Sequence, residues 1–423
     1  MGLCGRSRGG AIGLGLLLVL EGAAAGETPS GASVILISLD GTRPEDVVEG
    51  TLPSLLALAE RGVRAERLLS VAPTNTFPNH VTLVTGVSPA RHGLVNNAFF
   101  DPERGFFDRR KAEEWIEVEP IWSLVEGHGV PSASFHWVGS EGPWQGQKGA
   151  RDSRRFSGRT QEAEKVDQIL SWLDRSDPSD RPRLITAWFH GADHFGHEDG
   201  PGSESVGRSL RKQNVAIARL IRELEERDLF QTTTLIFVSD HGMVGAERRV
   251  DLKSALKKGG VDARVLGSGG FATVIRWGAS RNDSAALNRI VEIASGLGLD
   301  AVSQVALPAD SEFDHPRFGE VIVRAPVGTA IAGPQLRSEG FHGYDPNEPS
   351  MAAIFIAAGP GVVPGTRLSV VRAIDVAPTL LALLGLQIPA WMEGVPIAAL
   401  LPGAEPFATI PVPDTPEQPA PDS

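Results

Sequence analysis

The stretch Ala32–Gly41, ASVILISLDG, joins an almost uninterrupted apolar run to an acidic residue and a glycine. Such a run is typical of a strand that is buried on both faces of a parallel sheet. The segments 183–193, RLITAWFHGAD, and 232–242, TTTLIFVSDHG, repeat the pattern of an apolar strand followed by an acid. The sequence therefore predicts three strands of a parallel sheet, each ending near an acidic residue.

Helical patterns separate these strands. The segment 51–62, TLPSLLALAERG, predicts a helix closed by Gly62, and 63–71, VRAERLLSV, predicts another strand. The segment 205–228 has apolar residues at helical spacing with charged residues between them. We assign to its buried face Val215, Leu220, Ile221 and Leu224. A further strand is expected within 350–361, SMAAIFIAAGPG, before a final helix.

This alternation defines the predicted fold class. Strands that alternate with helices favour an α/β fold with a doubly wound, mostly parallel sheet. One part interrupts the order, because the chain from about 251 to 338 offers strand, helix and strand in succession. We interpret it as a small α+β insertion rather than another crossover of the main sheet.

The N-terminus has the organisation of an export signal. Arg6 and Arg8 precede the apolar run 11–20, and a small-residue stretch of alanines follows. We therefore expect residues 1–25 to be a signal peptide and the protein to be periplasmic or secreted. The run is shorter than the roughly 20 apolar residues of a membrane span, so no stable membrane anchor is expected. An uncleaved anchor is the alternative.

Composition restricts the partners. The formal net charge of −12 disfavours binding to nucleic-acid polymers, which requires clustered lysine and arginine. We expect a small-molecule substrate, and nothing in the sequence points to a protein partner. The single cysteine, Cys4, lies in the predicted signal, so the exported chain has no disulfides and relies on a large core or on bound metals. Residues 406–423 are rich in proline and predict a disordered tail.

Acids and histidines gather where the strands are expected to end. The motifs DHFGH and SDHGM each place histidine close to aspartate, and GFHGYDP supplies another histidine. Ligands of open α/β sheets collect at the carboxyl ends of the strands. Aspartate together with neutral histidine suits zinc or a similar divalent ion. The candidate ligands are Asp40, Asp193, His197, Asp240, His241 and His342.

The stretch 70–86, SVAPTNTFPNHVTLVTG, places polar residues at the start of a predicted helix. Pro78 suits the first turn, where its missing N–H is not needed. Thr76 has two interpretations here. It is either a helix cap, which accepts a bond from a free backbone N–H, or a nucleophile placed where those N–H groups stabilise an anion. The residues of this stretch alone leave both open.

An ordered set of motifs resembles a known family. The motifs are SLDGTRP, TNTFPNHVTLVTG, HGLVNNAF, DHFGHEDGP, SDHGM and FHGYDPNEPSMAAIFIAAGP, and FHWVGSEGP is similar to a further stretch of that family. Together they resemble the nucleotide pyrophosphatase/phosphodiesterase family (type I phosphodiesterases) of the alkaline phosphatase superfamily. The likeness runs from about residue 33 to residue 401. It implies the fold of that superfamily and a metal-dependent phosphodiesterase domain over 26–405.

The resemblance also implies a site with two zinc ions per chain. One ion is assigned to Asp40, Thr76, Asp240 and His241, and the other to Asp193, His197 and His342. Thr76 becomes the nucleophile, which forms a phosphothreonyl intermediate. Asn97 matches an asparagine of the family that donates a hydrogen bond to a phosphate oxygen. The backbone N–H of Phe77 is expected to assist, and its ring either stacks on a substrate base or packs on the helix.

The substrate is less well defined than the chemistry. The neutral Asn97 favours a monoanionic phosphodiester over a dianionic monoester, and the resemblance implies cleavage of phosphodiester or phosphoanhydride bonds. SPARHG lacks the Cys/Ser-x-Pro-x-Arg spacing of a sulfatase. Trp137 and Trp144 either line the substrate pocket or belong to the core. Choline-phosphate esters, glycerophosphodiesters and phosphonates stay open as substrates, as do a phosphomonoesterase on the same scaffold and a non-catalytic metal-dependent binding protein.

Overall fold

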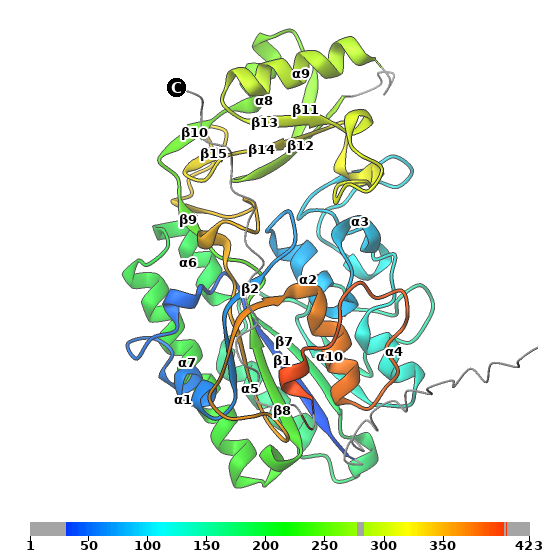
Figure 1. The fold of residues 1–423 in the computed structure, drawn as a ribbon, viewed down its shortest axis with the longest axis vertical. Helices are drawn as coiled ribbons and strands as arrows, with labels where there is room; N and C mark the ends of the chain where they lie inside the picture. Colours follow the sequence, from blue (N-terminus) through cyan, green and yellow to red (C-terminus); the bar gives the residue numbers. More distant parts are fainter. Residues whose placement is uncertain (1–30, 277–282, 402, 404–423) are drawn as a thin grey trace, which may run out of the picture.

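The computed structural model describes residues 31–276, 283–401 and 403. The predicted signal peptide (1–25) and tail (406–423) therefore lie outside the described residues. The chain forms a large sheet with helices on both faces and a smaller sheet, which Figure 1 shows above it. Among the described helices, none is both long enough and apolar enough to cross a bilayer.

The centre of the large sheet is β1 (Ser33–Leu39), which lies between β7 (Leu184–Phe189) and β8 (Thr233–Val238) and runs parallel to both. On the β7 side the sheet continues with β5 (Ser132–Phe135) and then β6 (Asp152–Arg154). On the β8 side it continues with β17 (Phe355–Ala358), β2 (Val63–Leu69) and then β18 (Thr366–Arg372). Only β17 runs antiparallel to its neighbours in this sheet. The predicted mostly parallel sheet is confirmed.

Helices cover both faces of this sheet (Figure 1). On one face lie α1 (Pro53–Glu60), α5 (Glu162–Leu173) and α7 (Glu204–Glu226), and on the other α2 (Thr76–Thr85), α4 (Ile121–Gly127) and α10 (Val376–Leu383). Ile35 and Ile37 of β1 pack in the first core, whereas Val34 and Leu36 pack in the second. Successive strand residues point to opposite faces, so the continuous apolar run of β1 fills both cores.

The predicted burial of one residue of α7 is wrong. Val215 is 70% exposed, whereas Leu220, Ile221 and Leu224 are buried as expected. The buried stripe of α7 repeats every three or four residues through Leu210, Gln213, Ile217, Leu220, Ile221 and Leu224, which leaves position 215 on the solvent side.

The smaller sheet is antiparallel, with the order β11 (Ala263–Ser268), β12 (Phe271–Arg276), β14 (Val321–Arg324) and β13 (Asp300–Ser303). The helices α8 (Leu252–Lys258) and α9 (Ser284–Gly296) share a core with it. This is the α+β insertion expected from the sequence. The stretch ARVLGSGGFATVIR forms a hairpin of two strands around Gly269 and Gly270.

The return of the chain from the insertion completes the site. The short strand β16 (Gly340–Phe341) pairs with β9 (Val244–Gly245), which follows β8. This pairing brings His342 back beside His241, about a hundred residues away in the sequence. The carboxyl ends of β1, β7 and β8 thus meet the segment that leaves the insertion.

Candidate active site

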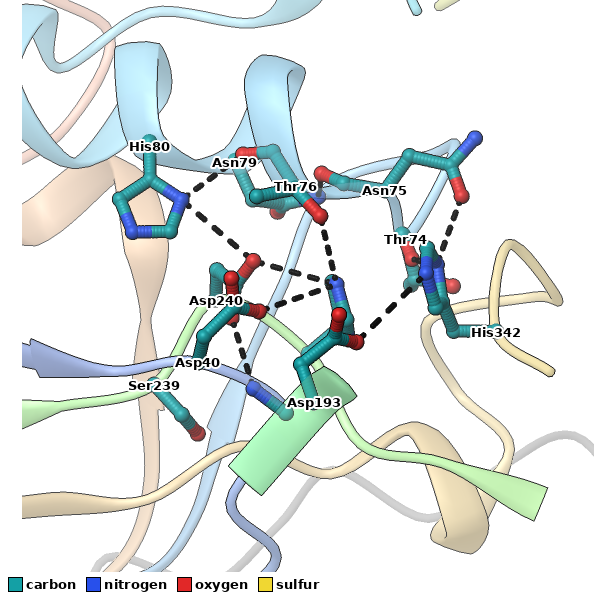
Figure 2. A network of polar contacts seen from close by, with 12 residues as sticks. Asp40, Thr74, Asn75, Thr76, Asn79, His80, Asp193, Ser239, Asp240 and His342 are labelled. Atoms are coloured by element: carbon teal, nitrogen blue, oxygen red, sulfur yellow. Dashed lines mark hydrogen bonds and ion pairs between the residues drawn. The ribbon is translucent and has the colours of Figure 1, made fainter. Parts of the chain in front are cut away.

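The side chain of Thr76 points away from its own helix into a polar site. Asn75 occupies the N-cap position of α2, and its side chain makes no capping hydrogen bond. Oγ1 of Thr76 lies 3.2 Å from Nε2 of His241. Figure 2 shows the hydroxyl on the side of the helix that faces Asp40 and Asp240. In this structure, therefore, the Thr76 side chain is not a helix cap.

Asp40, Asp240 and His241 form a first cluster of candidate metal ligands. Asp40 follows β1 and the other two follow β8, so the parallel pairing of these strands brings them together. Nε2 of His241 lies 3.1 Å from Oδ2 of Asp240 and 3.7 Å from Oδ1 of Asp40. Burial raises the pKa of Asp40 well above its ordinary value, and the carboxylates of Asp240 and Asp193 act in the same direction. The carboxylates of Asp40, Asp240 and Asp193 thus repel one another, and a cation bound among them would relieve this repulsion.

Asp193, His197 and His342 form a second cluster. The first two lie four residues apart on α6 (Gly191–Asp199), which puts them on one face of the helix. Nε2 of His197 lies 3.5 Å from Oδ1 of Asp193 and 3.1 Å from Nε2 of His342. The rings of His241 and His342 stack at 3.8 Å, so the two clusters are adjacent.

The three histidines of these clusters share one orientation. Each Nδ1 lies within hydrogen-bonding distance of a backbone carbonyl oxygen: Gly340 at 2.8 Å from His197, Gly242 at 2.9 Å from His241 and Thr74 at 3.0 Å from His342. A carbonyl only accepts, so Nδ1 carries the proton and Nε2 keeps its lone pair. Burial lowers the pKa of His342 well below its ordinary value, with His241 and His197 acting in the same direction, which keeps this ring neutral.

Unpaired carboxylate oxygens complete the donor set. Within the described chain, Asp40 Oδ1, Asp193 Oδ1 and Asp240 Oδ2 are buried and accept no hydrogen bond. A buried carboxylate oxygen that accepts no hydrogen bond is costly unless a cation neutralises the charge. Oxygen atoms of this kind beside imidazole Nε2 atoms are the ligands that zinc prefers. The arrangement therefore fits divalent cations.

Two further residues support this site and were missed in the sequence. Nε1 of Trp188 donates a 2.9 Å hydrogen bond to Oδ2 of Asp40. His80 is fully buried, and its Nδ1 lies 2.9 Å from the carbonyl oxygen of Thr76 and 3.4 Å from Oδ2 of Asp240. The signal for His80 was its position four residues after Thr76 in a predicted helix. The sequence around Trp188 gave no sign of this role, because its hydrogen-bond partner Asp40 follows a different strand.

The profile of the type I phosphodiesterase/nucleotide pyrophosphatase family matches residues 34–345. The chain belongs to this family.

Relatives in several organisms agree with that membership. A pyrophosphatase/phosphodiesterase of Schizosaccharomyces pombe is 34% identical over 353 residues, which are 78% of this chain and 71% of that protein. A human bis(5'-adenosyl)-triphosphatase is 26% identical over 84% of this chain and 78% of that protein. The match to a Caenorhabditis elegans ectonucleotide pyrophosphatase/phosphodiesterase spans only 47% of that longer protein.

Solved structures of the family show the same fold. Human ectonucleotide pyrophosphatase/phosphodiesterase 5 aligns with a TM-score of 0.76 and 25% identity over 84% of this chain and 96% of that one. An inactive Thr-to-Ala variant of the murine protein, in complex with AMP, aligns with the same TM-score at 24% identity, over 85% of this chain and 96% of that one.

Asn97 has a defined orientation in this family member. Its Oδ1 accepts a 2.8 Å hydrogen bond from the backbone N–H of Phe77, and its carbonyl oxygen accepts one of 3.1 Å from Nε of Arg109. Because a backbone N–H only donates, Oδ1 faces Phe77 and Nδ2 faces away. The Phe77 N–H, expected as a phosphate donor, is directed at Asn97.

A cavity of about 740 Å³ opens beside Thr76 in the phosphodiesterase fold. Its aromatic lining consists of Phe77, Phe156, Trp188 and Phe195 together with histidines. The rings of Phe156 and Trp188 stack at 4.8 Å with an angle of 26° between their planes. These rings provide flat apolar surface close to the nucleophile candidate.

The two tryptophans left open by the sequence are not in this lining. Trp137 is fully buried in the core beside α2 and α4, and its Nε1 donates to the carbonyl oxygen of His80. Nε1 of Trp144 donates to the carbonyl oxygen of Ile116. Both indoles therefore serve packing.

Proposed function

We propose that this protein is a two-zinc phosphodiesterase/nucleotide pyrophosphatase that cleaves phosphodiester or phosphoanhydride bonds through a phosphothreonyl intermediate. One observation carries the proposal. The hydroxyl of Thr76 lies 3.2 Å from Nε2 of His241, at a helix N-terminus and beside buried carboxylate oxygens that accept no hydrogen bond. A nucleophile in that position is surrounded by ligands for a cation.

The candidate ligands form two groups, and we assign one zinc ion to each group. Asp40, Thr76, Asp240 and His241 would hold one zinc ion, and Asp193, His197 and His342 the other. Bound zinc supplies Lewis acidity, which lowers the pKa of a coordinated hydroxyl and offsets the charge of a phosphate.

Thr76, Asn97 and the N-terminus of α2 contribute directly to the two chemical steps. Thr76 Oγ1 forms a bond to phosphorus and gives up its proton to solvent, while the bond from phosphorus to the leaving oxygen breaks and its electron pair stays with the leaving group. Water then attacks the phosphorus of the phosphothreonine. The bond from phosphorus to Oγ1 breaks, Oγ1 takes up a proton from this water, and the phosphate product leaves with the threonine hydroxyl restored. The N-terminus of α2 stabilises negative charge on the reacting group. Nδ2 of Asn97 donates to a phosphate oxygen that gains charge in the transition state.

The pocket and the relatives support a nucleotide as substrate. The rings of Phe77, Phe156 and Trp188 offer stacking surface within reach of Thr76. The related murine structure contains AMP, and the human relative is named for hydrolysis of bis(5'-adenosyl) triphosphate. The neutral amide of Asn97 further favours a monoanionic phosphate over a dianionic monoester.

Four chromogenic substrates test the function in parallel. These are the nitrophenyl esters of thymidine monophosphate and phosphorylcholine, bis-nitrophenyl phosphate and nitrophenyl phosphate. We expect the thymidine ester to be hydrolysed fastest, chelation to abolish the rate and zinc to restore it. A faster rate on phosphorylcholine would favour the choline-phosphate alternative, and a faster rate on nitrophenyl phosphate would favour a monoesterase. Zinc-loaded protein that hydrolyses none of them would be a binding protein.

We also propose that the protein is exported to the periplasm or secreted, on the basis of the Arg6–Arg8 region and the apolar run that follows. N-terminal sequencing of protein from the periplasmic and medium fractions tests this. A mature N-terminus near residue 26 supports export, and an intact Met1 in the cytoplasmic fraction contradicts it.

A further inference from the structure

We propose that Arg317, an arginine of the insertion, is a positioning residue, which holds the segment 93–101 so that the amide of Asn97 faces the substrate. The inference rests on the proposed hydrolytic function and adds the residue that keeps its phosphate donor in place. Arg317 lies in a helical turn (Pro316–Phe318) between β13 and β14, and its side chain is only 4% exposed. Figure 1 shows this part of the insertion in yellow, on the side that faces α3 (Pro89–His92).

The guanidinium of Arg317 binds both ends of that segment. Its Nη1 donates a 2.8 Å hydrogen bond to the carbonyl oxygen of Gly93, on the N-terminal side of Asn97. Its Nε donates a 2.7 Å hydrogen bond to Oδ2 of Asp101, on the C-terminal side. Asn97 stands midway between these two residues in the sequence. It therefore lies at the centre of a loop whose two ends are held by one side chain.

The same side chain also binds a second segment. Nη1 of Arg317 donates a 2.9 Å hydrogen bond to the carbonyl oxygen of Trp115, and Nη2 lies 2.8 Å from Oε1 of Glu117. The central carbon of the guanidinium lies 5.4 Å from the ring centroids of both Phe99 and Trp115. Arginine presents its N–H donors in a rigid planar fork, so one side chain can bind acceptors in several directions. Arg317 thus joins the insertion to two segments that precede it in the chain.

The local backbone explains why the segment needs such a partner. From Gly93 to Phe99 the described chain forms neither helix nor strand, so the carbonyl oxygens there need donors from elsewhere. Gly93 has a φ of +78°, and a Cβ added there would lie 2.5 Å from Nη1 of Arg317. Glycine adopts this left-handed backbone and leaves room for the guanidinium to reach the carbonyl oxygen.

The contact between Asn97 and Phe77 depends on where this segment lies. Oδ1 of Asn97 accepts the Phe77 N–H only while the segment stays against the start of α2. Arg109 also bonds to Asn97, but that hydrogen bond is exposed to solvent, whereas the contacts of Arg317 with Gly93 and the segment's far end are buried. Hydrogen bonds of a charged donor are stronger away from water. Loss of Arg317 should therefore loosen the segment and misplace Nδ2 of Asn97 without touching a zinc ligand.

A double-mutant cycle tests whether Arg317 acts through Asn97. Arg317→Lys keeps the charge beside the two carboxylates, so the protein should fold, but one ammonium cannot donate to all four acceptors. We expect kcat on bis-nitrophenyl phosphate to fall about tenfold at unchanged zinc content. In the Asn97→Ala background the same change should cost less than twofold, because the donor is already absent. Arg324→Lys, at an exposed arginine of the same insertion, should leave kcat unchanged in both backgrounds. Equal losses from Arg317→Lys in both backgrounds would overturn the proposal.

Hydrogen exchange of the Phe77 amide gives a readout that needs no turnover. This N–H lies in the first turn of α2, where no helical carbonyl is available, and it is protected by Oδ1 of Asn97. In Arg317→Lys it should exchange about tenfold faster than in the wild type, because the segment opens more often. Arg324→Lys should leave the exchange rate unchanged.

Asp101→Asn tests the same contact from its other side. Oδ1 of Asp101 accepts the backbone N–H groups of Glu103 and Arg104, so an asparagine would keep its oxygen there and turn Nδ2 toward Arg317. The arginine then loses one acceptor, and the Phe77 amide should again exchange faster. Unchanged exchange in either variant contradicts the positioning role even if every substrate is hydrolysed. Faster exchange in a protein that hydrolyses nothing would retain the positioning role and reject the hydrolytic function.

Discussion

The backbone N–H of Phe77 donates a 2.8 Å hydrogen bond to Oδ1 of Asn97, so the residue after Thr76 orients the amide that faces the substrate cavity. The same asparagine is held at its carbonyl oxygen by Arg109 and at its backbone N–H by Asn96. Three contacts thus fix Asn97 before any substrate binds. A donor that is fixed in advance needs no reorganisation when charge develops on a phosphate oxygen.

Replacement of Asn97 should therefore affect turnover more than binding of zinc. Asn97→Ala should lower kcat on bis-nitrophenyl phosphate about a hundredfold, because one donor of this kind contributes on the order of 3 kcal/mol in the transition state. Asn97→Asp keeps the acceptor for Phe77 but turns a carboxylate oxygen toward the phosphate, and should be slower still. If Asn97→Ala lowers the unfolding midpoint while its rate and diester preference stay at wild-type values, the residue only shapes its turn.

Removal of the Thr76 hydroxyl should abolish the reaction and leave the site assembled. Thr76→Ala should lose almost all hydrolysis yet keep its zinc, because Asp40, Asp240 and His241 still surround that position. Thr76→Ser should keep part of the rate. Mass spectrometry of acid-quenched wild-type protein should find a phosphate on the peptide that contains Thr76. Near wild-type turnover by Thr76→Ala would exclude the covalent route.

The second cluster should lose its metal when a ligand is removed. We expect His197→Ala to bind about one zinc equivalent fewer than the wild type, as measured by elemental analysis after dialysis. His194→Ala is the matched control, because His194 lies on the same helix with its side chain 70% exposed and should leave the zinc content unchanged. His342→Ala and Asp193→Ala should behave like His197→Ala. Two full equivalents in all three ligand variants would refute the assignment.

His92 should make the protein less stable in mild acid. Burial lowers its pKa from 6.5 to about 3, and the positive charges of His315 and Arg317 act in the same direction. The backbone N–H of Leu94 donates to Nδ1 of His92, so Nδ1 has no room for a proton. The unfolded chain takes up a proton below about pH 6.5 and the folded chain does not, so stability is lost as the pH falls from 6.5 toward 3.

Urea unfolding at pH 7.5 and at pH 5 measures this effect. His92→Gln should lose less stability between the two values than the wild type, by about 2 kcal/mol. His128→Gln changes an exposed histidine and should follow the wild type. Parallel losses in the wild type and His92→Gln would show that this histidine does not titrate differently in the two states.

The sequence by itself was enough for the scaffold and for the expectation that the candidate ligands lie close together. Apolar runs of strand length and the 3.6-residue period are local consequences of backbone geometry, so they predicted β1, β8 and the helices around them. Parallel strands place their carboxyl ends at one edge, which is why Asp40 and Asp240 could be expected to meet. Spacing along one helix likewise predicted that Asp193 and His197 share a face.

Tertiary structure alone decided which side chains complete the site. Trp188 bonds to Asp40 and stacks on Phe156 because strands and loops far apart in sequence pack together, whereas Trp137 of a similar local pattern is buried in the core. The orientation of Asn97 and the unpaired amide of Asn96 likewise depend on partners outside their own segments. Local periodicity carries no information on such partners, because contacts between distant segments are set only when the elements pack against one another.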